Sequence, residues 1–427
     1  MKRRYQIRMV VLSSGERLPM FLDFEGMPLF DVTVYSLTQL RARNRAANTI
    51  ESSLRSIMVL YIYLDIHKIN IIERLQQGEL LSLVEIESLV EFCHLPMAEI
   101  SSRLYVESKG VLPSPVTTSL EKYRKRFDQT SRKEVLPASA ANRLRIVRDY
   151  LVWLSLVRSS QQKKQSCHVE SLREAQQLIV KAINSMMPDV CTSDCLDDRE
   201  GLDQKSREKL LEVIEPDSED NPWMEEYSRY RNALIMHWLY YHGLRRGELL
   251  GIRISDINFQ ESTVVVARRA DDPQDPRRNQ PNAKTRARKI RLSPGLRDMT
   301  EAYIMSHRIA LPGARKHNFL FVASNSGKPM SISSLNKVFT VLSMKCPELP
   351  KLYPHIMRHT WNERFSEKMD KKKINEGKEK KMRSYLMGWL DTSGTAAIYT
   401  RRHVREAANK ISLEMQKNML GEDKNDE

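Results

Sequence analysis

Four short segments of the sequence carry side chains suited to chemistry on a phosphate group. They are residues 242–250 (HGLRRGELL), residues 282–285 (NAKT), residues 353–360 (YPHIMRHT) and residues 386–389 (LMGW), and Tyr399 follows the last of them. Together they supply arginine, lysine, histidine and tryptophan donors, and they end in a phenol that can act as a nucleophile. Guanidinium groups match the charge and geometry of a phosphate. The pattern therefore indicates phosphate chemistry carried out by protein side chains.

Motifs for a nucleotide or a metal are missing from the sequence. It contains no glycine-rich phosphate loop followed by Lys-Ser or Lys-Thr, and no His-Glu-x-x-His pair. Cys191 and Cys195 are separated by three residues, but a zinc site would need a second pair of ligands, and only Cys167-His168, upstream, offers one. Two ordinary thiols in a loop are the simpler interpretation. We therefore expect no cofactor and no metal.

In this order, the four segments resemble the tyrosine recombinases of the phage integrase family. The resemblance extends over about residues 200–410, and the helical region before them resembles the family's core-binding domain more loosely. A further shared feature is Leu320-Phe321 before the turn at residues 327–329. The resemblance implies a mainly α fold with a small β-sheet, in which a helical core-binding domain precedes a mixed, mostly helical catalytic domain.

The resemblance also implies a role for each matching residue. Tyr399 would attack the scissile phosphodiester, form a 3′-phosphotyrosine link and release a 5′-hydroxyl. Arg245 and Arg358 would hold the non-bridging oxygens, where charge grows in the transition state. Lys284 would protonate the departing 5′ oxygen. Because the ester keeps the energy of the broken bond, the reaction would need neither ATP nor a metal.

The remaining site residues are His355, Trp389 and Glu248. His355 would either donate to the phosphate or accept the tyrosine proton. Trp389 stands where most relatives carry histidine, and its indole can donate one N–H but cannot exchange a proton. Glu248 is expected to support the site by pairing with a cation. Alternatives to Arg245 and Lys284 lie close by in the sequence: Arg246, Arg286, Arg288 and Lys289.

The charge of the chain favours a polyanionic partner. Its 427 residues include 69 Lys and Arg against 54 Asp and Glu, a net charge of +15. Such a surplus of positive charge attracts nucleic acid over a long range. Binding is then favoured because it releases counterions from the nucleic acid. The charge is also segregated, since residues 189–220 hold 12 acids and 4 bases whereas residues 268–291 hold 9 bases and 3 acids. We expect one face to contact phosphates and another to contact water.

A lysine-rich segment, residues 371–383, lies between the second arginine and Trp389. It holds 7 bases and 2 acids and resembles an insertion into the family pattern, centred on Lys371 to Lys381. We interpret it as an added phosphate clamp, and a solvated loop is the alternative.

The sequence divides into five parts by its periodicity. Residues 1–30 alternate apolar and polar side chains and predict a β-hairpin, either an arm that touches DNA or a packing flap. The other parts are a helical core DNA-binding domain (31–160), a linker with one helix (161–200), the catalytic domain (201–420) and a polar tail (421–427).

Local signals place several elements within these parts. Thr49 is expected to cap a helix with a one-sided apolar stripe. A helix over residues 224–243 ends at its glycine, and residues 263–267 and 289–292 predict strands joined by a long loop. Residues 404–420 predict a last amphipathic helix that docks either on a neighbouring protomer or on its own domain.

Compartment and partners follow from the same features. The longest apolar run, residues 57–64, is too short to cross a membrane, and the 5 cysteines favour a reducing compartment. We expect a cytoplasmic, nucleoid-associated bacterial protein that makes no contact with a membrane.

By resemblance, the protein would recombine or integrate double-stranded DNA for a phage or another mobile genetic element. It would act as a homo-tetramer on DNA, together with accessory DNA-bending or directionality factors. A type IB topoisomerase and a non-catalytic DNA-binding regulator are the alternative functions.

Overall fold

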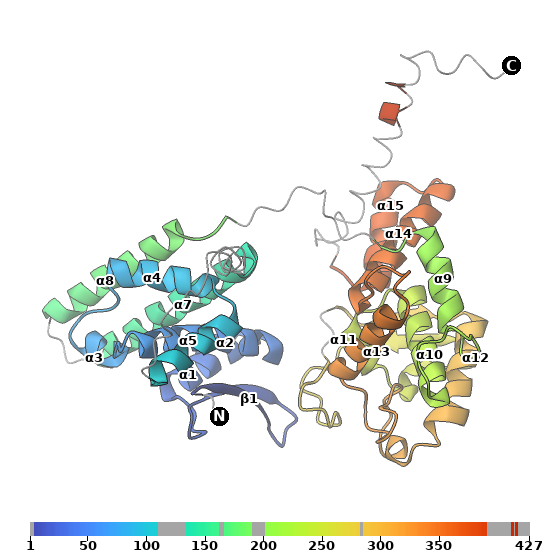
Figure 1. Cartoon of the computed structure of the whole chain (residues 1–427), viewed down its shortest axis with the longest axis horizontal. Helices are drawn as coiled ribbons and strands as arrows, with labels where there is room; N and C mark the ends of the chain where they lie inside the picture. The colour runs from blue at the N-terminus through green and yellow to red at the C-terminus, as the bar shows by residue number, and fades with distance from the viewer. Residues whose placement is uncertain are drawn as a thin grey trace, which may run out of the picture. The chain divides into compact units, whose positions relative to one another are not determined.

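The computed structural model describes residues 4–109, 134–161, 166–189, 201–281, 285–390, 411–413 and 415–416. The chain divides into two compact units, Met1–Asp197 and Asp198–Glu427 (Figure 1). Both are built mainly from helices, and each contains a small antiparallel sheet. The predicted mainly α fold with a small β-sheet is thus confirmed. In the parts of the chain that the structure describes, no helix is long and apolar enough to cross a membrane.

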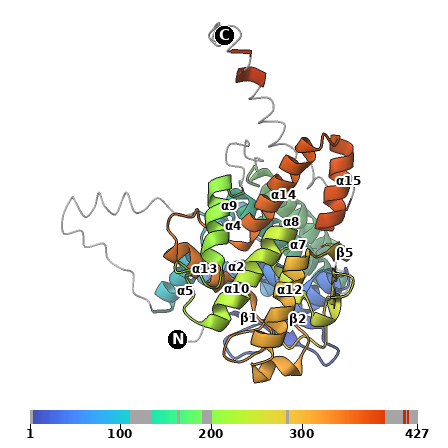
Figure 2. The same cartoon turned by 90° about the vertical axis from the view of Figure 1, so that its right-hand side faces the viewer.

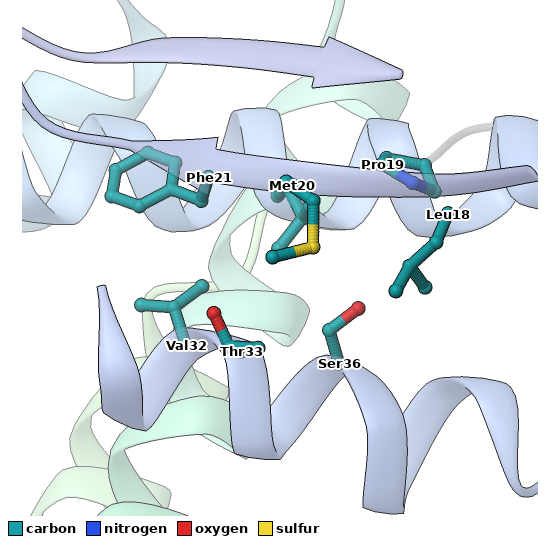
Figure 3. A pocket seen from close by; sticks show the side chains of 8 residues that line it. Leu18, Pro19, Met20, Phe21, Val32, Thr33 and Ser36 are labelled. Atoms are coloured by element: carbon teal, nitrogen blue, oxygen red, sulfur yellow. The ribbon is translucent and has the colours of Figure 1, made fainter. Parts of the chain in front are cut away.

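A β-hairpin opens the first unit. Strands β1 (Gln6–Val11) and β2 (Arg17–Leu22) pair antiparallel, so the hairpin predicted within residues 1–30 is confirmed. β2 packs against α1 (Phe30–Tyr35), and Phe21 faces Val32 across this contact (Figure 3). Because Phe21 is also packed against aromatic rings of the helical core, the second strand of the hairpin is part of that core.

Helix α2 (Ala47–Ile66) is the centre of the first unit and contacts β2 as well as three other helices. The remaining elements are η1 (Ser36–Arg41), α3 (Ile71–Gln76), α4 (Leu83–His94), α5 (Met97–Lys109), α7 (Pro137–Gln161) and α8 (Ser166–Ser185). α8 packs against α4 and α7, so this helix belongs to the same core as the helices before it.

The start of α2 differs from the prediction. Thr49 is not its N-cap, since the helix begins at Ala47 and the preceding Ala46 offers no side-chain cap. The Thr49 amide instead donates to the Ala46 carbonyl within the first turn. Ala47 is buried, so packing against the core rather than capping fixes where this helix begins.

Helix α10 (Glu226–His242) is the centre of the second unit, and most of its side chains are buried. It ends at Gly243, as predicted, in the left-handed conformation (φ 58°). A Cβ at this position would also lie 2.9 Å from Cγ of Trp361. Both the backbone angle and the close contact therefore require glycine at the end of α10.

Among the residues that the structure describes, the second unit contains twelve further elements, several of which pack against α10. They are α9 (Gln204–Ile214), α11 (Arg246–Gly251), η3 (Ile254–Asp256), β3 (Ile257–Asn258), β4 (Thr263–Val266), β5 (Arg288–Arg291), α12 (Pro294–Ala302), η4 (Tyr303–Arg308), η5 (Pro312–Lys316), α13 (Ile332–Lys345), α14 (Pro354–Lys371) and α15 (Glu376–Met387). The two predicted strands are β4 and β5, and the short β3 completes an antiparallel sheet in the order β3-β4-β5.

Helices α14 and α15 lie side by side in both views (Figures 1 and 2). The lysine-rich segment forms the end of α14, a short turn and most of α15, so the interpretation of it as a loop is wrong. Its helical part is fixed by the side chain of Asn375, which caps α15 by accepting from the Lys378 amide.

Two predictions fall largely outside the described residues. Cys191 and Cys195 lie there, and so does most of the predicted last helix. Of that helix the structure describes only residues 411–413 and 415–416, which are helical.

Candidate active site

Arg245 lies at the joint between α10 and α11. The left-handed Gly243 ends the first helix, and Arg245 is the N-cap residue of the second. The Arg245 amide donates to Oε2 of Glu248 at 3.1 Å, and its Nη1 donates to Oε1 at 3.4 Å. The Arg245 side chain is 29% exposed. Glu248 thus anchors Arg245 while part of the guanidinium still reaches the surface.

Glu248 is a buried carboxylate around which cationic and polar side chains gather. It accepts hydrogen bonds from Nη2 of Arg288 at 2.8 Å and from Oγ1 of Thr285 at 2.5 Å. Nη1 of Arg358 lies 4.0 Å from Oε2. The predicted pairing of Glu248 with a cation is therefore confirmed.

The ionisation of Glu248 depends on these neighbours. Burial alone would raise the pKa of the Glu248 carboxyl group, but the charge and hydrogen bond of Arg288, the charge of Arg358 and the hydrogen bond from Thr285 lower this pKa below its ordinary value. Glu248 is consequently a carboxylate at neutral pH, although its side chain has no contact with solvent.

Arg358 connects the ends of two helices. It lies in the first half of α14 and is buried; its Nη1 donates to the Gly243 carbonyl at 2.7 Å and its Nη2 to the Met387 carbonyl at 3.3 Å. Its Cζ lies 5.2 Å from the centre of the Trp389 ring, a cation–π contact. Arg358 and Trp389 therefore belong to one cluster with the joint that carries Arg245.

His355 lies one turn before Arg358 on α14 and is exposed. Positions three apart on a helix are neighbours on one face, so His355 and Arg358 share that face. The ring of His355 also meets the ring of His359 edge to face, at a centroid distance of 4.6 Å. This position suits a side chain that contacts a ligand approaching from solvent.

Lys284 and Tyr399 lie outside the described residues, but the chain next to Lys284 is well fixed. The Arg286 amide donates to the Gly388 carbonyl at 3.0 Å, and Nε of Arg288 donates to the Leu386 carbonyl at 2.6 Å. The loop that carries Lys284 in the sequence is thus attached, from Thr285 onward, to the end of α15 beside Trp389.

Arg288 is the residue of this cluster that sequence reasoning named only as an alternative to Lys284. Its side chain is 2% exposed and lies between the loop, α11 and α15. The alternation of side chains along a strand could have predicted this burial. Arg288 and Ile290 face inward on β5, while Lys289 and Arg291 face outward.

The assembled groups suit an oxyanion. Arg245, Arg288 and Arg358 surround a single carboxylate, so the cluster keeps a surplus of positive charge. Arginine forks and an indole N–H bind phosphate oxygens well. Among the described residues, no three His, Cys, Asp or Glu side chains gather as metal ligands.

The sequence of the second unit matches a known protein family. Residues 201–406 match the model of the phage integrase family. The second unit therefore carries a phage integrase family domain. No curated protein sequence matches the chain significantly.

Several solved structures are similar to the chain at low sequence identity. The Tn1549 transposon integrase in complex with circular intermediate DNA is 17% identical, with 71% of this chain and 88% of that chain covered and a TM-score of 0.40. XerA recombinase is 19% identical, with 72% and 94% covered and a TM-score of 0.36. XerH recombinase bound to its difH substrate is 15% identical, with 78% and 85% covered and a TM-score of 0.42.

Proposed function

We propose that this protein is a tyrosine-type, site-specific DNA recombinase that serves a mobile genetic element. It cleaves and rejoins DNA strands through a 3′-phosphotyrosine intermediate. The phage integrase family domain in residues 201–406 supports the class of reaction. The observation that carries the proposal for this chain is that Arg245 and Arg358, from distant segments, converge at the buried Glu248, and that Trp389 lies against Arg358.

In the proposed reaction, Arg245 and Arg358 hold the non-bridging oxygens of a phosphodiester in duplex DNA. The Tyr399 oxygen bonds to phosphorus, the bond from phosphorus to the 5′ oxygen breaks, and Lys284 gives that oxygen a proton. Arginine charge offsets the negative charge that grows on phosphorus. His355 and Trp389 add hydrogen-bond donors at the same phosphate.

The proposal predicts cleavage without a nucleotide or a metal. A nicked duplex carrying the end sequence of the encoding element should become covalently linked to the chain in buffer with EDTA and no ATP. The reason is that side chains supply the charge that a metal would supply, and the ester conserves the bond energy. The measurement is a denaturing gel of labelled DNA. A covalent complex that forms only after magnesium or ATP is added would contradict the proposed chemistry.

Two rival functions are separated by simple assays. A type IB topoisomerase would relax a supercoiled plasmid that carries no recombination site, whereas a site-specific recombinase would leave that plasmid supercoiled. A non-catalytic DNA-binding regulator would shift the DNA in a native gel but would form no covalent complex. The match of residues 201–406 to the phage integrase family favours recombination over both.

We also propose that the lysines at the α14–α15 turn are a DNA clamp. Lys371, Lys372 and Lys373 are exposed at this turn. Lys371 comes thirteen positions after Arg358 on α14, so at 1.5 Å per residue the turn lies about 20 Å along the helix from Arg358. These lysines would therefore contact backbone phosphates away from the point of cleavage.

Replacing Lys371, Lys372 and Lys373 by glutamine should weaken DNA binding and lower the slope of log Kd against log salt by roughly 1 per lost phosphate contact. Cleavage at saturating DNA should stay unchanged, because Arg358 and its partners are untouched. A matched control replaces Lys337, Lys345 and Lys351, which are also exposed. If the two triple variants lose DNA affinity equally, the effect is due to net charge and the clamp proposal is wrong.

On DNA we expect four copies to assemble, with accessory DNA-bending or directionality factors at the site. This assembly is carried over from the family resemblance. Sedimentation of the chain with a duplex of the element's end sequence measures it.

A further inference from the structure

We infer that Arg288 is a positioning residue, whose buried guanidinium sets the loop that carries Lys284 against Glu248 and the end of α15. The inference rests on the proposed function and goes beyond it, because Arg288 itself touches no reacting atom. Its guanidinium joins three segments that are far apart in the sequence: it donates to Glu248 on α11, to the Leu386 carbonyl on α15 and, at 3.4 Å, to Thr285 in its own loop.

Only arginine can make these contacts together. Nε donates to the Leu386 carbonyl, Nη2 to Glu248 and Nη1 to Thr285. The acceptors therefore lie on three sides of the planar guanidinium group. Lysine has one nitrogen on a flexible stem and cannot span these acceptors in the same geometry. A lysine at this position would keep the charge beside Glu248 but would release one of the other two segments.

The end of α15 is shaped to fit this guanidinium. Gly388 has a φ of 65°, and a Cβ built there would lie 2.8 Å from Nη1 of Arg288. The Gly388 carbonyl also accepts from the Arg286 amide, two residues before Arg288. Two hydrogen bonds, from the Arg286 amide and from Nε of Arg288, thus fix the loop to the backbone next to Trp389, and glycine at 388 leaves room for the guanidinium.

The loop end that Arg288 fixes is adjacent to the proposed general acid. Thr285 follows Lys284 directly in the chain, and its hydroxyl donates to Glu248 at 2.5 Å. Neighbouring Cα atoms are 3.8 Å apart, so a displacement of Thr285 must be transmitted to Lys284. Proton transfer requires close approach of donor and acceptor, so this displacement should slow departure of the 5′ oxygen.

The test exploits the leaving group. In a substrate with sulfur in place of the 5′-bridging oxygen, the electron pair of the broken bond leaves on sulfur as a thiolate, which needs no proton. Arg288→Lys should slow cleavage of the ordinary oxygen substrate about 10²-fold, the cost of a misplaced acid. The loss in rate on the sulfur substrate should be at least ten times smaller than the loss on the oxygen substrate. The ratio of the sulfur rate to the oxygen rate should therefore be higher in the variant than in the wild type.

A matched control is Arg383→Lys. Arg383 is also a buried arginine beside a buried carboxylate, but it bonds to Glu379 and Ser366 rather than to Glu248. This variant should lower the thermal midpoint of unfolding, as Arg288→Lys does, but should keep the wild-type ratio of the two cleavage rates. The ratio therefore separates positioning of the acid from a general loss of stability.

The outcomes are distinct. An Arg288→Lys chain that is equally slow on both substrates, or as fast as the wild type on both, overturns the positioning role. A wild-type chain that forms no covalent complex with either substrate overturns the proposed function, and the inference with it.

Discussion

Replacement of Tyr399 by phenylalanine should abolish the covalent protein–DNA complex and leave DNA binding intact. The substitution removes one oxygen atom, so it takes away the nucleophile without changing the charge of the chain. Loss of a nucleophile from a preassembled site costs about 10⁴-fold or more in rate. The measurement is the yield of covalent complex on a nicked duplex, with Kd measured in parallel by native gel shift.

The control for this experiment is Tyr385→Phe. Tyr385 is exposed on α15, and its hydroxyl donates to the Lys289 carbonyl at 3.3 Å. This variant should keep most of the wild-type activity. Covalent complexes that persist in Tyr399→Phe would refute the assignment of the nucleophile, and unchanged behaviour in every assay would favour a DNA-binding regulator.

Replacement of Glu248 by glutamine should have the second largest effect and should reduce both stability and cleavage. The change leaves Arg288 buried without its counter-charge and removes the anchor of Arg245. Breaking a buried ion pair by removing one partner costs roughly 3–5 kcal/mol. Urea denaturation should show this loss in the free energy of unfolding. Cleavage should fall with it because Arg245 and Arg358 no longer share a fixed, charged partner.

The stability difference between the two proteins should depend on pH in a defined direction. The pKa of Glu248 is lowered in the folded chain, so its stabilising contribution is fully present above the ordinary value of 4.5 and is lost as the pH falls through the folded value. The wild type should therefore approach the Glu248→Gln variant in stability only in acid. A difference that stays constant from pH 7 to well below pH 4.5 would show that the carboxylate charge is not the cause.

Glu379→Gln is the matched control for this prediction. Glu379 is buried and pairs with Arg383 away from the Glu248 cluster. Its replacement should lower the free energy of unfolding by a similar mechanism. At saturating DNA and below its melting range, however, it should cleave at close to the wild-type rate.

The sequence by itself predicted several of the elements and the residues of the proposed chemistry. The glycine at position 243 predicts the end of α10 because the left-handed conformation suits glycine. Alternation of side chains predicts β4 and β5 within one residue, since the strand period is local. Arg245, Arg358 and Trp389 are identified by segments whose order matches a family, and the structure brings these three together.

Other features were decided only by tertiary structure. The start of α2 is set by burial of Ala47, which competes successfully with the local capping signal at Thr49. The charge of the lysine-rich segment left both a phosphate clamp and a solvated loop open, and in the structure most of the segment is helical, with α15 packed beside α14. Charge composition does not reveal that Glu379 and Arg383 of α15 are buried and bond to Ser366 of α14.

The role of Arg288 is the clearest case of this kind. Its partners Glu248 and Leu386 lie 40 and 98 residues away in the chain. The alternation of side chains within one strand indicates that Arg288 faces inward. It does not predict which carboxylate or carbonyl group Arg288 will contact. That choice arises when α11, β5 and α15 pack together, because a buried guanidinium must find acceptors for its donors in whatever backbone surrounds it.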